Sequence, residues 1–160
     1  MIIVILGVAG TGKTTVGRAL AETLGWGFYD ADDLHAPDDR ERMRRGEALT
    51  DMLRQPWLER VRAVIVRAAN RDEHAVIACS ALKQRYRDVL SRGLPTRFVF
   101  LSADADVLRA RLQQRPNHFA GVALLESQLA TLEPPSHVLA LDAALSVDAL
   151  VARIRSTFGI

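Results

Sequence analysis

The chain has 160 residues, which suits one domain with a sizeable core. Apolar residues make up 49% and charged residues 25%, as is typical of soluble globular proteins. The net charge of +2 and the scattered arginines do not favour nucleic-acid binding, and the single cysteine excludes an internal disulfide. No apolar run approaches the roughly 20 residues of a membrane span, and the run over residues 2–6 is short for a signal peptide. We therefore expect a cytoplasmic protein without membrane or nucleic-acid partners.

Short apolar runs alternate with segments of helical periodicity along the chain. In order, the pattern predicts strand 2–6, helix 13–24, strand 27–30, helix 57–69, strand 75–79, helix 82–92, strand 97–101, helices 104–115 and 123–132, strand 138–141 and helix 147–158. Pro56 is expected in the first turn of the second helix. This alternation predicts an α/β fold with a parallel sheet, in which ligands bind beyond the carboxyl ends of the strands.

A phosphate-binding loop follows the first predicted strand. Residues 7–14 read GVAGTGKT, which matches the pattern G-x-x-x-x-G-K-[ST] between a strand and a helix. Its backbone N–H groups and the helix N-terminus suit phosphate oxygens. Lys13 is expected to reach the β- and γ-phosphates of ATP, and the Thr14 hydroxyl to bind Mg²⁺. The predicted nucleotide contacts here are Gly7, Gly10, Thr11, Gly12, Lys13, Thr14 and Thr15.

The second predicted strand ends in the acidic turn YDADDL. The third strand ends without an aspartate, so Asp30 is the candidate for a second Mg²⁺ ligand, directly or through water. Asp32 is the candidate to accept a hydrogen bond from an acceptor hydroxyl and orient it for attack on the γ-phosphate. The alternative is that these aspartates cap the following helix, a role that suits Asp33.

Basic side chains are placed to meet an anionic acceptor. Lys83 and Arg87 are four residues apart, so they share one face of a helix whose first turn contains Lys83. Arg54 precedes Pro56 and could reach the same acceptor. The alternative for Lys83 and Arg87 is a solvated charged face.

A later helix carries arginines that could close over the phosphates. Arg111 and Arg115 are four apart, and Arg115 precedes Pro116. Either could meet the charge that develops during transfer, or one could pack on adenine. Arg109 is a further candidate nucleotide contact. His118 fits a mobile lid and a surface position equally well.

Together these motifs resemble the gluconokinases of the P-loop small-molecule kinase group. The resemblance spans roughly residues 2–135 and depends most on CSALK-x-x-YRD and the SQ-x-x-TLE-P segment. It implies a P-loop fold similar to nucleoside monophosphate kinases: a single three-layer domain over residues 1–160, a five-stranded parallel sheet and a helical lid. The acceptor-binding segment is expected at about 33–58 and the lid at about 112–126.

The resemblance also implies an activity. It predicts Mg²⁺- and ATP-dependent phosphorylation of D-gluconate at its 6-hydroxyl, giving 6-phospho-D-gluconate and ADP, commonly by a homodimer. The residues that match the acceptor positions of the family are Asp32, His35, Arg54, Ser80, Lys83 and Arg87, and those that match its lid are Arg111, Arg115 and His118. The chain departs from the family pattern at Ala36, Asp39, Leu53 and Ala120-Gly121.

Two other interpretations are open. A shikimate kinase would also suit Asp30 and Asp32, but that family is expected to have three glycines where Cys79, Ser80 and Ala81 stand. A nucleotide-binding module without kinase turnover would leave the YDADD and SALK motifs unexplained. Phosphate transfer with gluconate, with shikimate and without acceptor separates the three.

Overall fold

Five parallel strands form one sheet in the order β2-β3-β1-β4-β5. The computed structural model describes residues 1–114, 116 and 118–160, without the side chains of residues 118 and 119. The strands are β1 (Ile2–Leu6), β2 (Gly27–Asp30), β3 (Ala75–Ala78), β4 (Thr96–Ser102) and β5 (Leu139–Asp142). The central strand β1 is buried along its whole length, as its β-branched sequence IIVIL predicts. The expected α/β fold with a five-stranded parallel sheet is confirmed.

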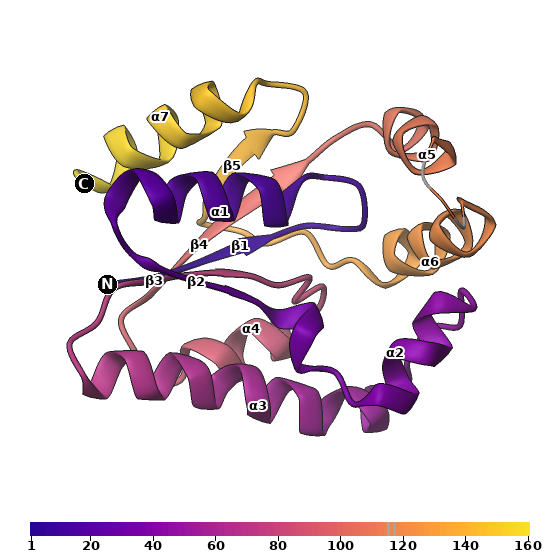
Figure 1. Cartoon of the computed structure of the whole chain (residues 1–160), viewed down its shortest axis with the longest axis horizontal. Helices are drawn as coiled ribbons and strands as arrows, with labels where there is room; N and C mark the ends of the chain where they lie inside the picture. The colour runs from indigo at the N-terminus through magenta and orange to yellow at the C-terminus, as the bar shows by residue number, and fades with distance from the viewer. Residues whose placement is uncertain (115, 117) are drawn as a thin grey trace.

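Helices cover both faces of the sheet (Figure 1). They are α1 (Lys13–Leu24), α2 (Pro37–Arg44), α3 (Asp51–Asn70), α4 (Gln84–Ser91), α5 (Ala105–Gln113), α6 (His118–Thr131) and α7 (Val147–Phe158), with a 3₁₀ turn, η1 (Ala31–Leu34). Helices α1 and α7 pack on one face, where Leu20 and Ile154 meet Ile3 of β1. Helices α3 and α4 pack on the other, where Trp57 and Leu90 join the side chains of β1 and β3.

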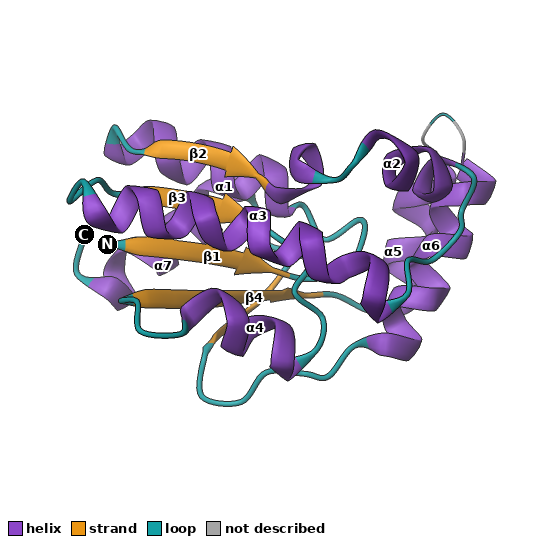
Figure 2. Ribbon diagram, turned by 90° about the horizontal axis from the view of Figure 1, so that it is seen from below, coloured by secondary structure: helices purple, strands orange, loops and turns teal. Residues whose placement is uncertain are grey.

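The carboxyl ends of the strands point toward α2, α5 and α6, and both termini lie at the opposite end (Figure 2). A third apolar cluster joins Val8 of the loop after β1 to Leu108 of α5 and Leu125 of α6. The cluster therefore holds α5 and α6 beside the carboxyl edge, where ligands of such sheets bind. No helix in the described ranges is both long and apolar enough to cross a bilayer.

Three local predictions were wrong. Helix α3 begins at Asp51, because the Thr50 hydroxyl accepts a hydrogen bond from the Leu53 N–H at 3.3 Å. Pro56 therefore lies in the second turn rather than the first. Lys83 is the N-cap residue of α4 and precedes its first turn.

Helix α2 has no counterpart among the predicted elements. Its sequence PDDRERMR has no apolar periodicity, so the usual signal was missing. It starts with Pro37, carries Asp38 and Asp39 in its first turn, and has Arg42 and Arg44 in its last turn. Those charges oppose the partial charges of the helix ends and so stabilise a short polar helix.

Candidate active site

The loop between β1 and α1 has the backbone that its glycines predict. A Cβ at Gly7 would lie 2.6 Å from both the Leu101 carbonyl oxygen and the Thr11 hydroxyl, so no larger residue fits. The Thr11 hydroxyl donates a hydrogen bond to the Val8 carbonyl at 2.9 Å. Lys13 donates to the same carbonyl at 3.0 Å. The lysine thus lies folded over the loop that is expected to hold phosphate.

Two side chains at the carboxyl edge are placed to hold Mg²⁺. The Thr14 hydroxyl donates to Asp30 Oδ2 at 2.7 Å, and Asp30 Oδ1 accepts the Asp32 N–H at 3.0 Å. Asp30, rather than Asp33, therefore caps η1. Within the described residues no three His, Cys, Asp or Glu side chains are grouped as a metal site. Mg²⁺ in kinases needs only one or two protein ligands beside phosphate and water, so Thr14 and Asp30 fit that ion.

Asp32 lies next to this pair and lines a small cavity. Its side chain keeps contact with water, but the surrounding protein disfavours its charge and raises its pKa above 3.8. Lys13 opposes that rise, while Asp30 and Asp33 add to it. A carboxylate of this kind can accept a hydrogen bond from a hydroxyl and later its proton.

The cavity beside the phosphate loop has a volume of about 100 Å³ and mixes polar and apolar walls. It is lined by Ala9, Lys13, Asp32, His35, Met43, Leu49, Arg54, Trp57, Ser80, Leu82, Leu124 and Gln128. The structure therefore brings together five of the predicted site residues from four separate segments: Lys13, Asp32, His35, Arg54 and Ser80.

His35 is held in this cavity as a neutral ring. It stacks on Trp57 with ring centroids 4.5 Å apart and an interplanar angle of 6°. Burial lowers the pKa of His35 to about 4, although Asp39 partly opposes the effect. Its Nδ1 atom is buried and has no hydrogen-bond partner in the parts of the chain that the structure describes. An unpaired buried nitrogen is costly, so a bound hydroxyl that pairs with it would be favoured.

Arg54 is the cation that reaches the same cavity from α3. Its guanidinium lies over the Tyr86 ring, 5.8 Å from the centroid, and donates to the Tyr86 hydroxyl at 3.3 Å. These contacts hold Arg54 at the wall, as an anionic acceptor would require.

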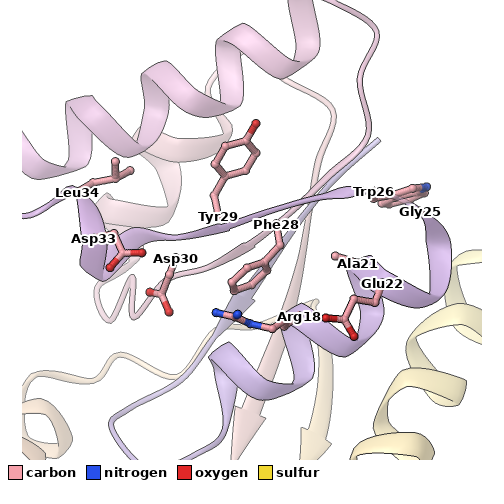
Figure 3. A pocket seen from close by; sticks show the side chains of 10 residues that line it. All are labelled: Arg18, Ala21, Glu22, Gly25, Trp26, Phe28, Tyr29, Asp30, Asp33 and Leu34. Atoms are coloured by element: carbon pink, nitrogen blue, oxygen red, sulfur yellow. The ribbon is translucent and has the colours of Figure 1, made fainter.

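A larger hollow of about 530 Å³ lies between α1 and β2 (Figure 3). Asp30 and Asp33 border it, and its one basic side chain, Arg18, lies 5.3 Å from the centre of the Phe28 ring. Lys13 and Asp32 do not line this hollow. The smaller cavity is therefore the better acceptor site despite its size.

Lys83 is engaged outside the cavity. Its ammonium donates to both oxygens of Asp51, at 3.2 and 3.1 Å, and the same carboxylate binds Arg85 and the Tyr86 hydroxyl. The Tyr86 hydroxyl and these cations hold the pKa of Asp51 well below its usual range. An acceptor anion would have to compete with Asp51 for Lys83.

Arg87 does not point to the acceptor. Its side chain is 2% exposed and donates to the carbonyls of Ala81 and Leu82, each at 3.0 Å, and of Glu133 at 2.9 Å. Ala81 has a φ of 34°, which a residue with a Cβ rarely adopts. Arg87 therefore holds the strained turn after β3 in place and does not line the cavity, and its contact with substrate stays a prediction. The neighbouring Cys79 is buried, which raises its thiol pKa to about 12, so it is not a nucleophile.

The arginines of α5 also differ from expectation. Arg109 bridges to Asp106 at 2.7 Å and to Glu126 of α6 at 2.5 Å, so it links α5 with α6, and its nucleotide contact stays a prediction. Arg111 donates to the carbonyls of Gly10 at 3.3 Å and Ala143 at 2.9 Å. This position beside the loop after β5 fits packing on adenine better than contact with a γ-phosphate. Arg115 and the side chain of His118 lie outside the described residues.

No role was predicted from the sequence for three residues of the site. Asp51, which binds Lys83, lies 32 residues before it in the chain. Gln128 and Glu133 belong to the SQ-x-x-TLE segment, which the family resemblance included without a role for either side chain. Both were identifiable only through contacts made across the fold.

Comparisons with known proteins agree with this geometry. A family model described as shikimate kinase matches residues 9–133. A probable gluconokinase of Xenopus tropicalis is 41% identical, over 96% of this chain and 91% of its own length.

Two solved structures are similar over nearly the whole chain. An unliganded sugar kinase from Janibacter sp. HTCC2649 is 37% identical with a TM-score of 0.91, covering 99% of this chain and 94% of its own. A gluconokinase from Sinorhizobium meliloti 1021 is 40% identical with a TM-score of 0.81, covering 98% and 94%. With the phosphate loop and the acidic turn in one site, the chain is a kinase of the shikimate kinase family and belongs to its gluconokinases.

Proposed function

We propose that the protein transfers the γ-phosphoryl group of ATP to the 6-hydroxyl of D-gluconate, giving 6-phospho-D-gluconate and ADP. The observation that carries the proposal is the cavity in which Lys13 and Asp32 meet Arg54, Ser80 and His35. Gluconate is a monoanion with several hydroxyl groups, so it suits a wall where Arg54 can meet a carboxylate beside several hydrogen-bonding side chains, while Lys13 serves the phosphate. Gluconokinase relatives and the sugar-kinase structure support the same assignment.

The proposed roles follow from the positions of the side chains. Lys13 neutralises charge on the phosphate oxygens as it spreads in the transition state. Asp32 orients the acceptor hydroxyl and takes its proton as the new oxygen–phosphorus bond forms and the bond to ADP breaks. Bound Mg²⁺ would neutralise further phosphate charge, with Thr14 and Asp30 as the residues that hold it.

Arg54 and Ser80 are proposed to bind the carboxylate and hydroxyl groups of gluconate, and His35 Nδ1 to pair with one hydroxyl. Lys83 is proposed as an outer contact that the acceptor carboxylate shares with Asp51. Arg111 is proposed to pack beside the adenine. The proposal is supported by the cavity lining of Arg54, Ser80 and His35, by the contact of Lys83 with Asp51, and by the contact of Arg111 with the Gly10 carbonyl of the phosphate loop.

Residues 33–58 and 112–126 are proposed as the acceptor-binding segment and the lid. A cavity of about 100 Å³ is smaller than the roughly 300–1,000 Å³ of most ligand sites, so binding requires these segments to separate. They touch where a Cβ on Gly46 would lie 3.1 Å from Ala120 Cα. A homodimer and a cytoplasmic location are proposed from the family resemblance, and light scattering on the purified protein tests the dimer.

A coupled assay for ADP tests the proposed function. With ATP and Mg²⁺, turnover is expected with gluconate and not with shikimate or without acceptor. Mass spectrometry of the product checks the addition of one phosphoryl group, and phosphorus–carbon couplings place it on C6. Equal ATP hydrolysis with and without gluconate would contradict the proposal.

A further inference from the structure

Gln128 of α6 connects the phosphate loop with the cavity. Its Oε1 atom accepts a hydrogen bond from the Ala9 N–H at 2.7 Å, although the residues lie 119 positions apart in the chain. A backbone N–H can only donate, so this contact fixes which end of the amide faces Ala9. The NH₂ end is thus free of that contact, and Gln128 lines the cavity together with Lys13 and Asp32. That nitrogen has no hydrogen-bond partner among the residues that the structure describes.

The C-terminal part of α6 is anchored, which keeps this amide in place. Leu125 is fully buried against the cluster that contains Val8. Just beyond α6, the Glu133 N–H donates to the Leu82 carbonyl at 2.9 Å, and the Glu133 carboxylate accepts the Gln84 N–H at 2.6 Å. Gln128 thus lies on a helix tied to both the phosphate loop and the turn after β3.

Gluconate has several hydroxyl groups, so the one neutral donor already assigned to the cavity, the Ser80 hydroxyl, cannot serve them all. Ionised Asp32 only accepts hydrogen bonds, and Arg54 carries a charge that suits a carboxylate. A sugar hydroxyl oxygen also needs a neutral donor that adds no charge beside Lys13. The amide NH₂ of Gln128 is such a donor.

We propose that Gln128 is a specificity-determining residue that donates a hydrogen bond to one hydroxyl of the sugar acid while its oxygen holds the phosphate loop at Ala9. This inference rests on the proposed gluconate kinase activity. An acceptor without that hydroxyl would leave a polar group unpaired at the site. Sites built to bond a hydroxyl reject analogues that lack it far more strongly than apolar pockets reject a missing methylene.

Two substitutions test the roles of the Gln128 oxygen and of its NH₂ group separately. Gln128→Glu keeps the shape and an oxygen for the Ala9 N–H but loses the NH₂ donor. Gln128→Met has a similar volume and loses both. The matched control is Asn70→Asp, the same amide-to-carboxylate change at the exposed end of α3. We expect both Gln128 variants to raise the KM for gluconate about tenfold or more with the KM for ATP within about twofold, and the control to resemble wild type.

Monodeoxy analogues of gluconate exclude a simple charge effect. Repulsion between the carboxylate introduced in Q128E and the carboxylate of the acceptor would raise the KM of every analogue alike. The loss of one donor instead predicts a single deoxy analogue that wild type discriminates against and Q128E does not. The donor role would be overturned if no deoxy analogue showed this difference between wild type and Q128E, or if the KM for gluconate were unchanged in Q128E.

Hydrogen exchange at the Ala9 N–H tests the contact made by the Gln128 oxygen, and this measurement does not depend on catalysis. Exchange should be faster in Q128M and close to wild type in Q128E, and equal protection in all three proteins would overturn the contact with the loop.

Wild-type turnover is measured first. Its absence with gluconate would overturn the proposed function and with it the donor role, whereas wild-type turnover with an unaffected Q128E removes the donor role alone.

Discussion

The phosphate side and the acceptor side of this site are built in different ways. The phosphate loop is one contiguous segment, residues 7–14, whose shape follows from its glycines and from the strand and helix around it. The acceptor cavity gathers side chains from η1, α3, the turn after β3 and α6. The first side can therefore be predicted from local spacing, while the second depends on contacts across the fold. Substitutions on the two sides should differ in the same way.

Lys13→Ala is expected to have the largest effect. It removes the cation that meets the phosphate oxygens, so kcat/KM should fall about 10³-fold or more for any acceptor. The measurement is the coupled assay with saturating gluconate, together with a melting curve to show that the fold is intact. Residual activity within tenfold of wild type would contradict the role assigned to Lys13.

Asp32→Asn tests the point where the two sides meet. Loss of the carboxylate that takes the hydroxyl proton should lower kcat about 10²-fold, with little change in the KM for ATP. In the wild type, kcat should fall as the pH falls through the pKa of Asp32, which lies above 3.8. This fall of kcat at low pH should be absent from the residual activity of the variant. If the fall is unchanged in the variant, a group other than Asp32 causes it.

The same carboxylate has a predictable effect on stability. A pKa that is higher in the folded state means that the folded protein binds the proton more tightly than the unfolded chain. Stability therefore decreases as the pH rises from below 3.8 through the raised pKa. Asp32→Asn should for this reason be at least as stable as wild type at neutral pH, by a small margin because the side chain keeps contact with water.

The elements of the fold were largely predictable, because apolar runs and their glycine boundaries are local signals. The bounds of β1, α1 and β2 coincide with the predicted ones. Helix α2 and the start of α3 were not predicted, since the first has no apolar face and the second depends on the Thr50 cap. In the site, spacing identified Lys13 and Thr14 directly.

The spacing of Lys83 and Arg87 was misleading for a physical reason. Residues four apart share a helix face only if both are in the helix, and Lys83 is the N-cap. Arg87 instead turns inward and donates to backbone carbonyls at the strained Ala81 turn. Neither the N-cap position of Lys83 nor the inward contacts of Arg87 can be predicted from the spacing of residues along the chain.

Arg87→Ala should separate structure from recognition on the acceptor side. It removes a donor from the carbonyls of Ala81, Leu82 and Glu133, of which Leu82 keeps the hydrogen bond from the Glu133 N–H, so the free energy of unfolding should fall by roughly 2–4 kcal/mol. Denaturant melts measure this change, and Arg92→Ala, at the exposed end of α4, is the control. If stability were unchanged and the KM for gluconate rose alone, Arg87 would be a substrate contact after all.

Lys83→Ala is expected to have the smallest effect of the series. The KM for gluconate should rise a few-fold and more than the KM for ATP, because Lys83 is an outer contact already engaged by Asp51. Asp51→Asn sharpens the test, since it removes the competing carboxylate and leaves Lys83 in place. A lower gluconate KM in D51N would mean that the acceptor carboxylate and Asp51 compete for the same ammonium. A more than tenfold rise in K83A with no change in D51N would instead place Lys83 inside the acceptor site, and the cavity would then have to extend beyond Arg54 when substrate binds.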